Sequence, residues 1–337
     1  MKTAVVILNW NGKKLLQKFL PSVIQFSPSA SIYVIDNCSN DDSISLIKEQ
    51  FPQVKIIQNE KNFGFAKGYN EGLKKINAPY FLLLNSDVEV TDNWLHPLEK
   101  LLNENVQMAA CQPKVLSFSK PDYFEYAGAA GGFIDKYGYP FCRGRIFTEI
   151  EKDQKQYEGN SEIFWASGAA MLVRSDLFFK AEGFDENFFA HMEEIDLCWR
   201  LKNMGYQIGY TSHSKVFHVG GATLQYDSPN KTYLNFRNNL LTLLKNLPQQ
   251  KLFLILLIRM LLDGTAAIKF LLELKFLYVW AIFKAHLSFY KNFYAYYKRR
   301  TKKEILQTNG IFEGSIVVQF FIKKTKTFSQ LEPTKFS

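Results

Sequence analysis

The stretch Phe81-Leu82-Leu83-Leu84-Asn85-Ser86-Asp87 decides how the rest of the chain is interpreted. Its apolar run predicts a short buried strand, and Asp87 follows at the carboxyl end of that strand. In open α/β sheets, ligands bind at the carboxyl ends of the strands. Asp87 is therefore a candidate ligand for Mg²⁺ or Mn²⁺, which prefer carboxylate and phosphate oxygens. The alternative is that Asn85-Ser86-Asp87 only caps a helix.

The neighbouring segments alternate between strand-like and helix-like patterns. Strands are predicted over residues 4–8, 31–35, 54–58 and 80–84, and helices over 13–25, 43–50 and 68–76. Repeated β-α-β units of this length predict an α/β fold with a mostly parallel sheet flanked by helices. Farther on, the patterns indicate a strand-like run over 164–173 that is broken by Ser167-Gly168, a helix over 194–205, and strands over 207–210 and 215–218. The segment 93–165 has no clear pattern, and loops over a site are expected at 126–132 and 137–144.

The composition is that of a folded protein with one or two domains, since 47% of the 337 residues are hydrophobic and 22% are charged. The net charge of +9 is uneven: residues 241–337 hold 16 Lys and Arg against 5 Asp and Glu, whereas residues 1–240 hold 25 against 27. We therefore expect an α/β catalytic domain over 1–240 and a basic, helical C-terminal region over 241–337. The basic residues alternate with Leu, Phe and Tyr, which favours an anionic membrane surface over nucleic acid as the partner.

The C-terminal region is strongly apolar over 252–262 and 266–290, but charged side chains interrupt both segments. No window of about 18 residues is free of charge, so a membrane-spanning helix is not expected. Interfacial amphipathic helices are favoured, and a helical pair packed on the catalytic domain is the alternative. The basic runs Lys298-Arg299-Arg300 and Lys302-Lys303 either bind anionic headgroups or are simply solvated. A first strand so close to Met1 and the absence of a CxxC pair predict a reduced, cytoplasmic protein.

Polar residues also follow the other predicted strands. Asp36 opens an Asn- and Ser-rich loop, where a carboxylate can accept a hydrogen bond from a nucleobase imide or from ribose, or can cap the next helix. Asn9 and Asn11 frame a base pocket or form only a turn. The segment 62–72 carries glycines at a spacing of four, which would let backbone amides approach an anion, and Lys67 adds positive charge. As a phosphate loop the segment matches neither a Walker nor a Rossmann fingerprint.

The segment Glu193-Glu194-Ile195-Asp196 follows two aromatic residues and opens a predicted helix. Carboxylates this close cannot all ionise cheaply, so one of them is expected to have a raised pKa, as a general base requires. The alternative is that they only complement the helix N-terminus. His218 ends an apolar strand and is typical of a neutral metal ligand, although a lone histidine is also commonly structural.

The order of these segments resembles the family 2 glycosyltransferases, most of all the branch with rhamnosyl- and galactofuranosyltransferases. The resemblance covers about residues 3–245 and rests on the blocks 5–12, 35–37, 62–66, 84–87, 167–174, 183–186, 193–197 and 216–218. It implies a GT-A fold and a metal-dependent, inverting single displacement at the anomeric carbon.

The resemblance also implies roles for individual residues. Asp87 and His218 would bind Mn²⁺ or Mg²⁺, and Glu194 would be the base, with Glu193 and Asp196 as alternatives. The nucleotide sugar would be contacted by Asn9, Asn11, Asp36, Asn62, Gly64, Asn70, Asn85, Ser86, Trp165, Gly168 and Arg237. Within this set Asp36 would meet the nucleobase, Arg237 the diphosphate, and Trp165 a sugar face unless it is a core residue. Asn85 and Glu194 stand where the family more often has Asp.

These observations predict an inverting glycosyltransferase, peripheral on the cytoplasmic face of a membrane. It would move a rhamnose-like sugar from a UDP- or dTDP-sugar to a lipid-linked glycan acceptor of a surface polysaccharide. A nucleotidyltransferase would need a Gly-rich basic loop after the first strand, which Asn9-Trp10-Asn11-Gly12 does not offer. Asn85 and Glu194 leave a second alternative, a catalytically degenerate sugar-nucleotide-binding or scaffold subunit.

Overall fold

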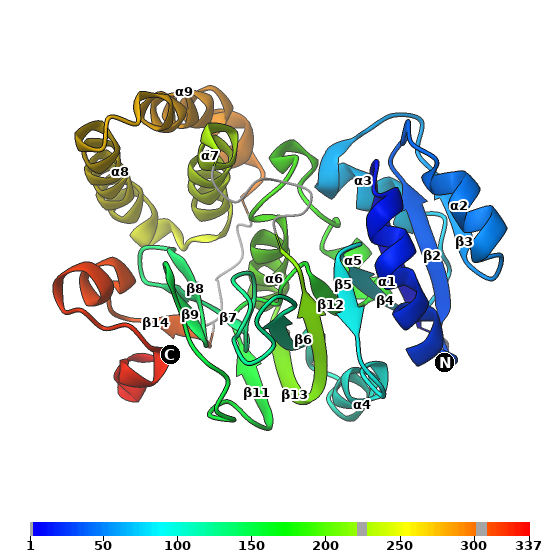
Figure 1. Cartoon of the computed structure of the whole chain (residues 1–337). Helices are drawn as coiled ribbons and strands as arrows, with labels where there is room; N and C mark the ends of the chain where they lie inside the picture. The colour runs from blue at the N-terminus through cyan, green and yellow to red at the C-terminus, as the bar shows by residue number, and fades with distance from the viewer. Residues whose placement is uncertain (1–2, 221–227, 301–308) are drawn as a thin grey trace.

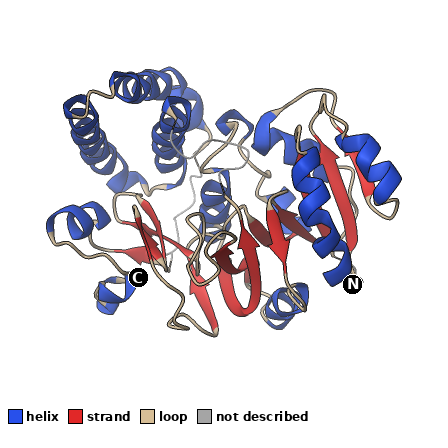
Figure 2. Cartoon of the chain, in the orientation of Figure 1, coloured by secondary structure: helices blue, strands red, loops and turns tan. Residues whose placement is uncertain are grey.

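The computed structural model describes residues 3–220, 228–300 and 309–337 (Figure 1). Its centre is a nine-stranded sheet with helices on both faces (Figure 2). The strands are β1 (Ala4–Asn9), β2 (Ser31–Asp36), β3 (Lys55–Gln58), β4 (Tyr80–Leu84), β5 (Val88–Val90), β6 (Met108–Ser117), β11 (Asn160–Ile163), β12 (Ala170–Arg174) and β13 (Gln207–His218). Their order is β11-β13-β6-β12-β4-β1-β2-β3, and β5 pairs with β13.

The four N-terminal strands β3, β2, β1 and β4 are parallel, as the sequence predicts. Asn9 pairs with Asp36 in register, so the polar ends of β1 and β2 meet at one edge. β12 runs antiparallel to β4 and β6, whereas β13 runs parallel to β6. The sheet is therefore parallel-rich and mixed.

Two apolar cores cover the two faces of this sheet. Alternate residues of β1 point to opposite sides, so that Val5 and Ile7 belong to one core and Ala4 and Val6 to the other. The first core includes α1 (Lys13–Phe26), α2 (Ser43–Gln50) and α4 (Leu95–Glu104). The second includes α3 (Gly64–Leu73), α5 (Ser175–Lys180) and α6 (Glu193–Asn203).

Three predicted boundaries were wrong. The helix expected from residue 68 begins at Gly64, because the amides of Phe65 and Ala66 donate to the distant carbonyl of Phe189 and so satisfy the first turn. The strand expected over 164–173 is confined to β12. The two strands expected over 207–210 and 215–218 are one strand, β13, with an irregular register between Thr211 and Lys215.

The segment 93–165 is more regular than the sequence indicates. It contains α4, β6, β11 and most of a second sheet, in the order β10-β9-β8-β7-β14. That sheet is formed by β7 (Gly132–Asp135), β8 (Pro140–Cys142), β9 (Arg145–Ile146), β10 (Glu149–Ile150) and β14 (Ile311–Phe312). The loops expected at 126–132 and 137–144 thus include strand residues, and Phe133 and Phe141 are buried in the core.

The C-terminal region forms three long helices, α7 (Pro229–Asn246), α8 (Gln249–Leu272) and α9 (Phe276–Lys298). They form a layer beside α6 and the small sheet, with α7 packed on α9 and on α6 (Figure 1). No helix in the described ranges combines the length and the low charge needed to cross a bilayer. Arg300 donates to the carbonyls of Leu244 and Leu247 at the end of α7, so this member of the predicted headgroup-binding run has an internal role. Lys302 and Lys303 lie outside the described residues.

Candidate active site

A buried polar cluster joins the ends of β1 and β2. Asp36 is 1% exposed, and its Oδ1 accepts from Asn9 Nδ2 at 3.0 Å and from Ser39 Oγ at 2.6 Å. Asn11 lies beside it, with its Oδ1 accepting from the Asn40 amide at 2.7 Å. Asp36 therefore does not cap α2, the alternative considered from the sequence. Its carboxylate is held at the sheet edge where a nucleobase would bind.

The start of α3 is attached to this cluster. Asn37 Nδ2 donates to Asn62 Oδ1 at 2.8 Å and to the Gly64 carbonyl at 3.0 Å. Gly64 has φ +77°, and a Cβ at this position would lie 2.5 Å from the Phe189 ring. Asn62 and Gly64 thus border the predicted nucleotide region, and only glycine allows the close approach of Phe189.

Asp87 and His218 meet although they lie at the ends of different strands. Asp87 Oδ1 is 3.1 Å from His218 Nε2, and Asn85 Nδ2 is 3.3 Å from the same nitrogen. Strand β5 begins at Val88 directly after Asp87, so the helix-cap alternative was wrong. Ser86 is nearly buried in the turn between β4 and β5.

A residue that the sequence analysis missed completes this group. Glu125 is 3% exposed, and its Oε2 lies 3.3 Å from His218 Nδ1. Burial alone would lower the pKa of His218, but the neighbouring carboxylates of Asp87 and then Glu125 outweigh burial and raise that pKa to about 10. The sequence offered little sign of Glu125 beyond a single acid between Phe124 and Tyr126 in a segment without a pattern.

The Asp87–His218 pair fits a divalent cation that is shared with a ligand. Across the described ranges, no three His, Cys, Asp or Glu side chains converge as in an all-protein metal site. Mg²⁺ needs only one or two protein ligands when phosphate oxygens supply the others. A metal-binding histidine typically donates its second ring N–H to a carboxylate, and Glu125 stands at that second nitrogen.

Glu193 and Glu194 form the first turn of α6, and neither carboxylate is fully partnered. Oε2 of each is buried without a hydrogen bond in the described structure. Burial raises the pKa of Glu194 to about 7; burial and then the charge of Glu194 raise the pKa of Glu193 well above its usual value. Glu194 is a partly exposed residue. A Cβ placed on Gly168 would lie 3.9 Å from the Cβ of Glu194. Glu194 and Gly168 are therefore neighbours.

Asp196 has a different environment from the two glutamates. Its carboxylate is fully buried and lies 2.8 Å from both Arg200 Nε and Lys245 Nζ. Although burial opposes ionisation, these cations and Asn246 lower the pKa of Asp196. Of the three predicted candidates, Asp196 is a structural ion-pair partner, which leaves Glu193 and Glu194 as possible bases.

Three residues predicted to contact the sugar nucleotide have hydrogen-bond partners within the protein. Trp165 is buried, its Nε1 donates to the Phe133 carbonyl at 3.0 Å, and Gly132 packs on its ring, as the core alternative holds. Asn70 bonds both backbone groups of Phe184 and so clamps the loop after α5. Arg237 donates to carbonyls of the loop before α6.

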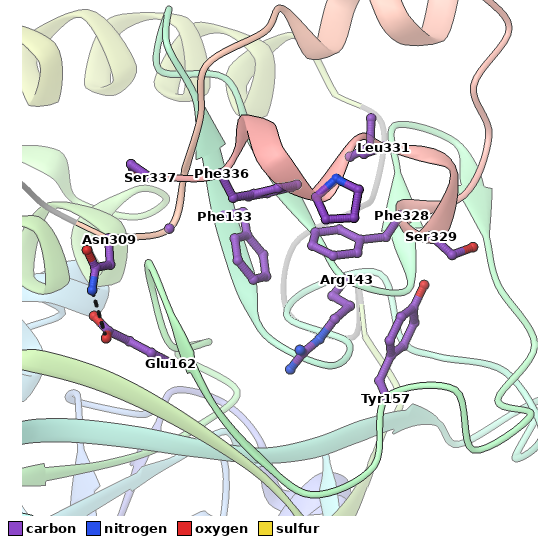
Figure 3. Close-up of a pocket in the computed structure, with 12 residues that line it drawn as sticks. Phe133, Arg143, Tyr157, Glu162, Asn309, Phe328, Ser329, Leu331, Phe336 and Ser337 are labelled. Carbon is purple, nitrogen blue, oxygen red and sulfur yellow. Dashed lines mark hydrogen bonds between the residues drawn. The ribbon is translucent and has the colours of Figure 1, made fainter.

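A cavity of about 580 Å³ lies elsewhere, between β7 and the C-terminal segment (Figure 3). Aromatic side chains line it, among them Phe133, Phe328 and Phe336, with Arg143 at one side. None of the residues predicted for the site lines this cavity. The candidate active site is therefore defined by converging polar side chains at the sheet edge.

Solved structures identify the fold. GalNAc-T7 with UDP, GalNAc and Mn²⁺ aligns over 72% of this chain and 47% of its own, with a TM-score of 0.55 and 19% identity. TarS 1–349 of S. aureus in complex with UDP-GlcNAc aligns over 90% and 93%, with a TM-score of 0.54 and 16% identity. The chain has the GT-A fold of glycosyltransferases, which confirms the predicted fold.

Sequence relatives identify the family. The model of glycosyl transferase family 2 matches residues 4–178. Rhamnosyltransferase WbbL of Escherichia coli K12 is 39% identical over 223 residues, which cover 64% of this chain and 82% of that protein. The N-acetylglucosaminyl-diphospho-decaprenol L-rhamnosyltransferase of Mycobacterium tuberculosis is 23% identical over 233 residues, covering 64% and 75%. The chain belongs to glycosyl transferase family 2 and is a glycosyltransferase, as its sequence blocks predict.

Proposed function

We propose that this glycosyltransferase is inverting and metal-dependent. It transfers a rhamnose-like sugar from a UDP- or dTDP-sugar to a lipid-linked glycan during assembly of a surface polysaccharide. The observation that carries the proposal is that Asp36, Asp87 and Glu194 belong to one edge of the sheet. The parallel strands β2, β1 and β4 end there with Asp36 and Asp87. Strand β12 runs antiparallel to β4, so Gly168 just before it lies at the same edge, and Glu194 adjoins Gly168. The names of the relatives, two rhamnosyltransferases of which one acts on a diphospho-decaprenol, support the sugar and the acceptor.

The donor would be oriented by the sheet edge. Asp36, held by Asn9 and Ser39, would accept a hydrogen bond from the imide N–H of uracil or thymine. Asp87 and His218 would hold Mn²⁺ or Mg²⁺, which when bound supplies positive charge to the leaving diphosphate. Asn85 and Ser86 lie in the same turn and would contact the bound donor.

Glu194 is the base in this proposal. It would take the proton of an acceptor hydroxyl, whose oxygen forms a bond to the anomeric carbon as the bond from that carbon to the diphosphate oxygen breaks. Attack from the opposite face inverts the anomeric configuration. Glu194 is preferred over Glu193 because it adjoins Gly168 and, taken as a whole residue, is partly exposed although its Oε2 is buried, whereas Glu193 is buried throughout. A pKa near 7 suits a base that must be ionised before the reaction and protonated after it.

The C-terminal region is proposed to bind the cytoplasmic face of a membrane. Extended exposed apolar surfaces mark contacts with membranes or other proteins. On α8 and α9 the exposed apolar and aromatic side chains are Phe253, Leu254, Leu257, Leu261, Ile268, Leu271, Leu272, Phe276, Leu277, Trp280, Phe283, Leu287, Tyr290, Phe293, Tyr294 and Tyr297. Lys269 and Lys275 flank the turn between these helices, and both pair with Glu273, at 3.7 and 3.0 Å. Two cations against one carboxylate leave these three residues with a positive charge, which favours an anionic surface.

The test of the function is metal-dependent donor hydrolysis by wild type and Asp87→Ala. A panel of UDP-, dTDP- and GDP-sugars is incubated with Mn²⁺ or Mg²⁺, and released nucleotide is measured. We expect the wild type to hydrolyse one donor, and we expect this hydrolysis to be lost in Asp87→Ala. Binding of a donor without turnover, even with a competent acceptor, would favour the degenerate scaffold subunit instead.

A further inference from the structure

The loop that leads into the base is strained. Phe189, His191 and Met192 have φ of 64°, 70° and 74°, and α6 begins with Glu193 immediately afterwards. Non-glycine residues rarely adopt this left-handed region, and such conformations persist only where the surrounding structure enforces them. Contacts from elsewhere must therefore hold the backbone that delivers Glu194.

Helix α7 supplies many of those contacts. Asn238 is fully buried, and its Nδ2 donates to the carbonyls of Phe188, Ala190 and His191 at 3.1, 3.0 and 2.8 Å. Arg237, the preceding residue, donates to the carbonyls of residues 187 and 188 at 2.8 and 3.0 Å. Two adjacent side chains thus bind four carbonyls of one short loop.

Helices α7 and α9 also bind both ends of the loop through ion pairs and hydrogen bonds. Lys245 Nζ lies 2.7 Å from Asp185 and 2.8 Å from Asp196, so one cation joins the residue before the loop to the first turn of α6. Tyr296 of α9 donates to Asp185 at 3.1 Å, and Asn246 of α7 donates to Asp196 at 2.8 Å. Helices α7 and α9 are therefore built into the surroundings of the predicted base.

We propose that Asn238 is a positioning residue for the catalytic base, and that α7 belongs to the active site. By binding the loop carbonyls, Asn238 keeps the left-handed conformations that aim the start of α6 toward the acceptor. The inference rests on the proposed role of Glu194. It also places the functional boundary of the catalytic unit after α7, since α7 runs through residue 240.

The experiment compares Asn238→Ala with Asn239→Ala. Asn239 is the next residue of α7, is equally buried, and donates to the Gly138 carbonyl at 2.9 Å, away from the loop. Both variants lose a buried amide, so both should lose thermal stability. Only Asn238→Ala should lower kcat for hydrolysis of the accepted donor, by about a hundredfold with KM little changed, because small misplacement of reacting groups has effects of this size.

Hydrogen exchange adds a readout that needs no donor. The amides of Phe65 and Ala66 donate to the Phe189 carbonyl at 2.8 and 3.3 Å, so they report on the loop. Their exchange, and that of residues 185–192, should accelerate in Asn238→Ala and not in Asn239→Ala. Equal exchange and equal kcat in the two variants would overturn the inference. Turnover that survives in Glu194→Gln would instead overturn the proposed base, and exchange would still decide whether Asn238 holds the loop.

Discussion

Substitution of Glu125 tests whether this carboxylate orients the His218 ring for metal binding. To bind a cation through Nε2, the His218 ring must lose the Nε2 proton that faces Asp87 and keep its proton on Nδ1, and Glu125 Oε2 lies 3.3 Å from Nδ1. Glu125→Ala removes the acceptor that fixes both the tautomer and the ring orientation. Loss of such an outer partner typically weakens metal affinity 10- to 100-fold, or about 1.4–2.7 kcal/mol.

The assay is an electron paramagnetic resonance titration of Mn²⁺ in the presence of UDP or dTDP. Glu125→Ala should raise the Mn²⁺ Kd by 10- to 100-fold, Glu125→Gln should have a smaller effect, and His218→Ala a larger one. Asp122→Asn is the control, because Asp122 lies nearby in sequence and its side chain is 75% exposed. A Glu125→Ala variant that folds and binds Mn²⁺ like the control would refute the reasoning.

Three further predictions address the base, the glycine and the helices. Because Glu194 acts ionised and its pKa is raised to about 7, kcat/KM should rise with pH to a plateau above that value, and Glu194→Gln should abolish turnover at every pH. Gly64→Ala should lower the free energy of unfolding in urea by about 1–3 kcal/mol, since φ is +77° and the new Cβ would meet Phe189; unchanged stability would contradict this geometry. The double substitution Leu272→Asp and Trp280→Asp should abolish flotation with phosphatidylglycerol vesicles while leaving Tm nearly unchanged, as both side chains are exposed; undiminished flotation would exclude this surface.

The N-terminal half could be predicted because its local patterns and its tertiary structure agree. Strands β1, β2 and β4 are short apolar runs that end in polar residues, and parallel strands bring those ends to one edge. The positions of Asp36 and Asp87 at this edge could therefore be predicted from the local pattern, and their roles there stay predictions. Strand β6 was missed because it is almost wholly buried and contains Gln112, Pro113 and Lys114, so neither alternation nor β-propensity marks it.

The sequence predicts which polar residues lie near the candidate site better than it predicts which of them contact one another. Asp87 and His218 are 131 residues apart, and their pairing depends on the antiparallel register of β5 with β13. Glu125 reaches His218 only through the irregular segment that precedes the second sheet, which no local periodicity describes. Trp165 and Asp196 are residue types that suit a sugar site. In the folded chain, however, Gly132 packs against the Trp165 ring and Lys245 forms an ion pair with Asp196. Neither contact can be predicted from local sequence.

The C-terminal helices lie between the proposed membrane-binding surface and the proposed catalytic base. The apolar faces of α8 and α9 are exposed, whereas α7 packs on α9 and binds the loop before Glu193. Lys245 and Tyr296 join the same layer to Asp185 through charge and hydrogen bonding. In the proposed membrane-bound state, a layer with lipid on one side and the loop before Glu193 on the other would hold the proposed base at a set position relative to the bilayer. That arrangement suits an acceptor whose own anchor lies in the membrane.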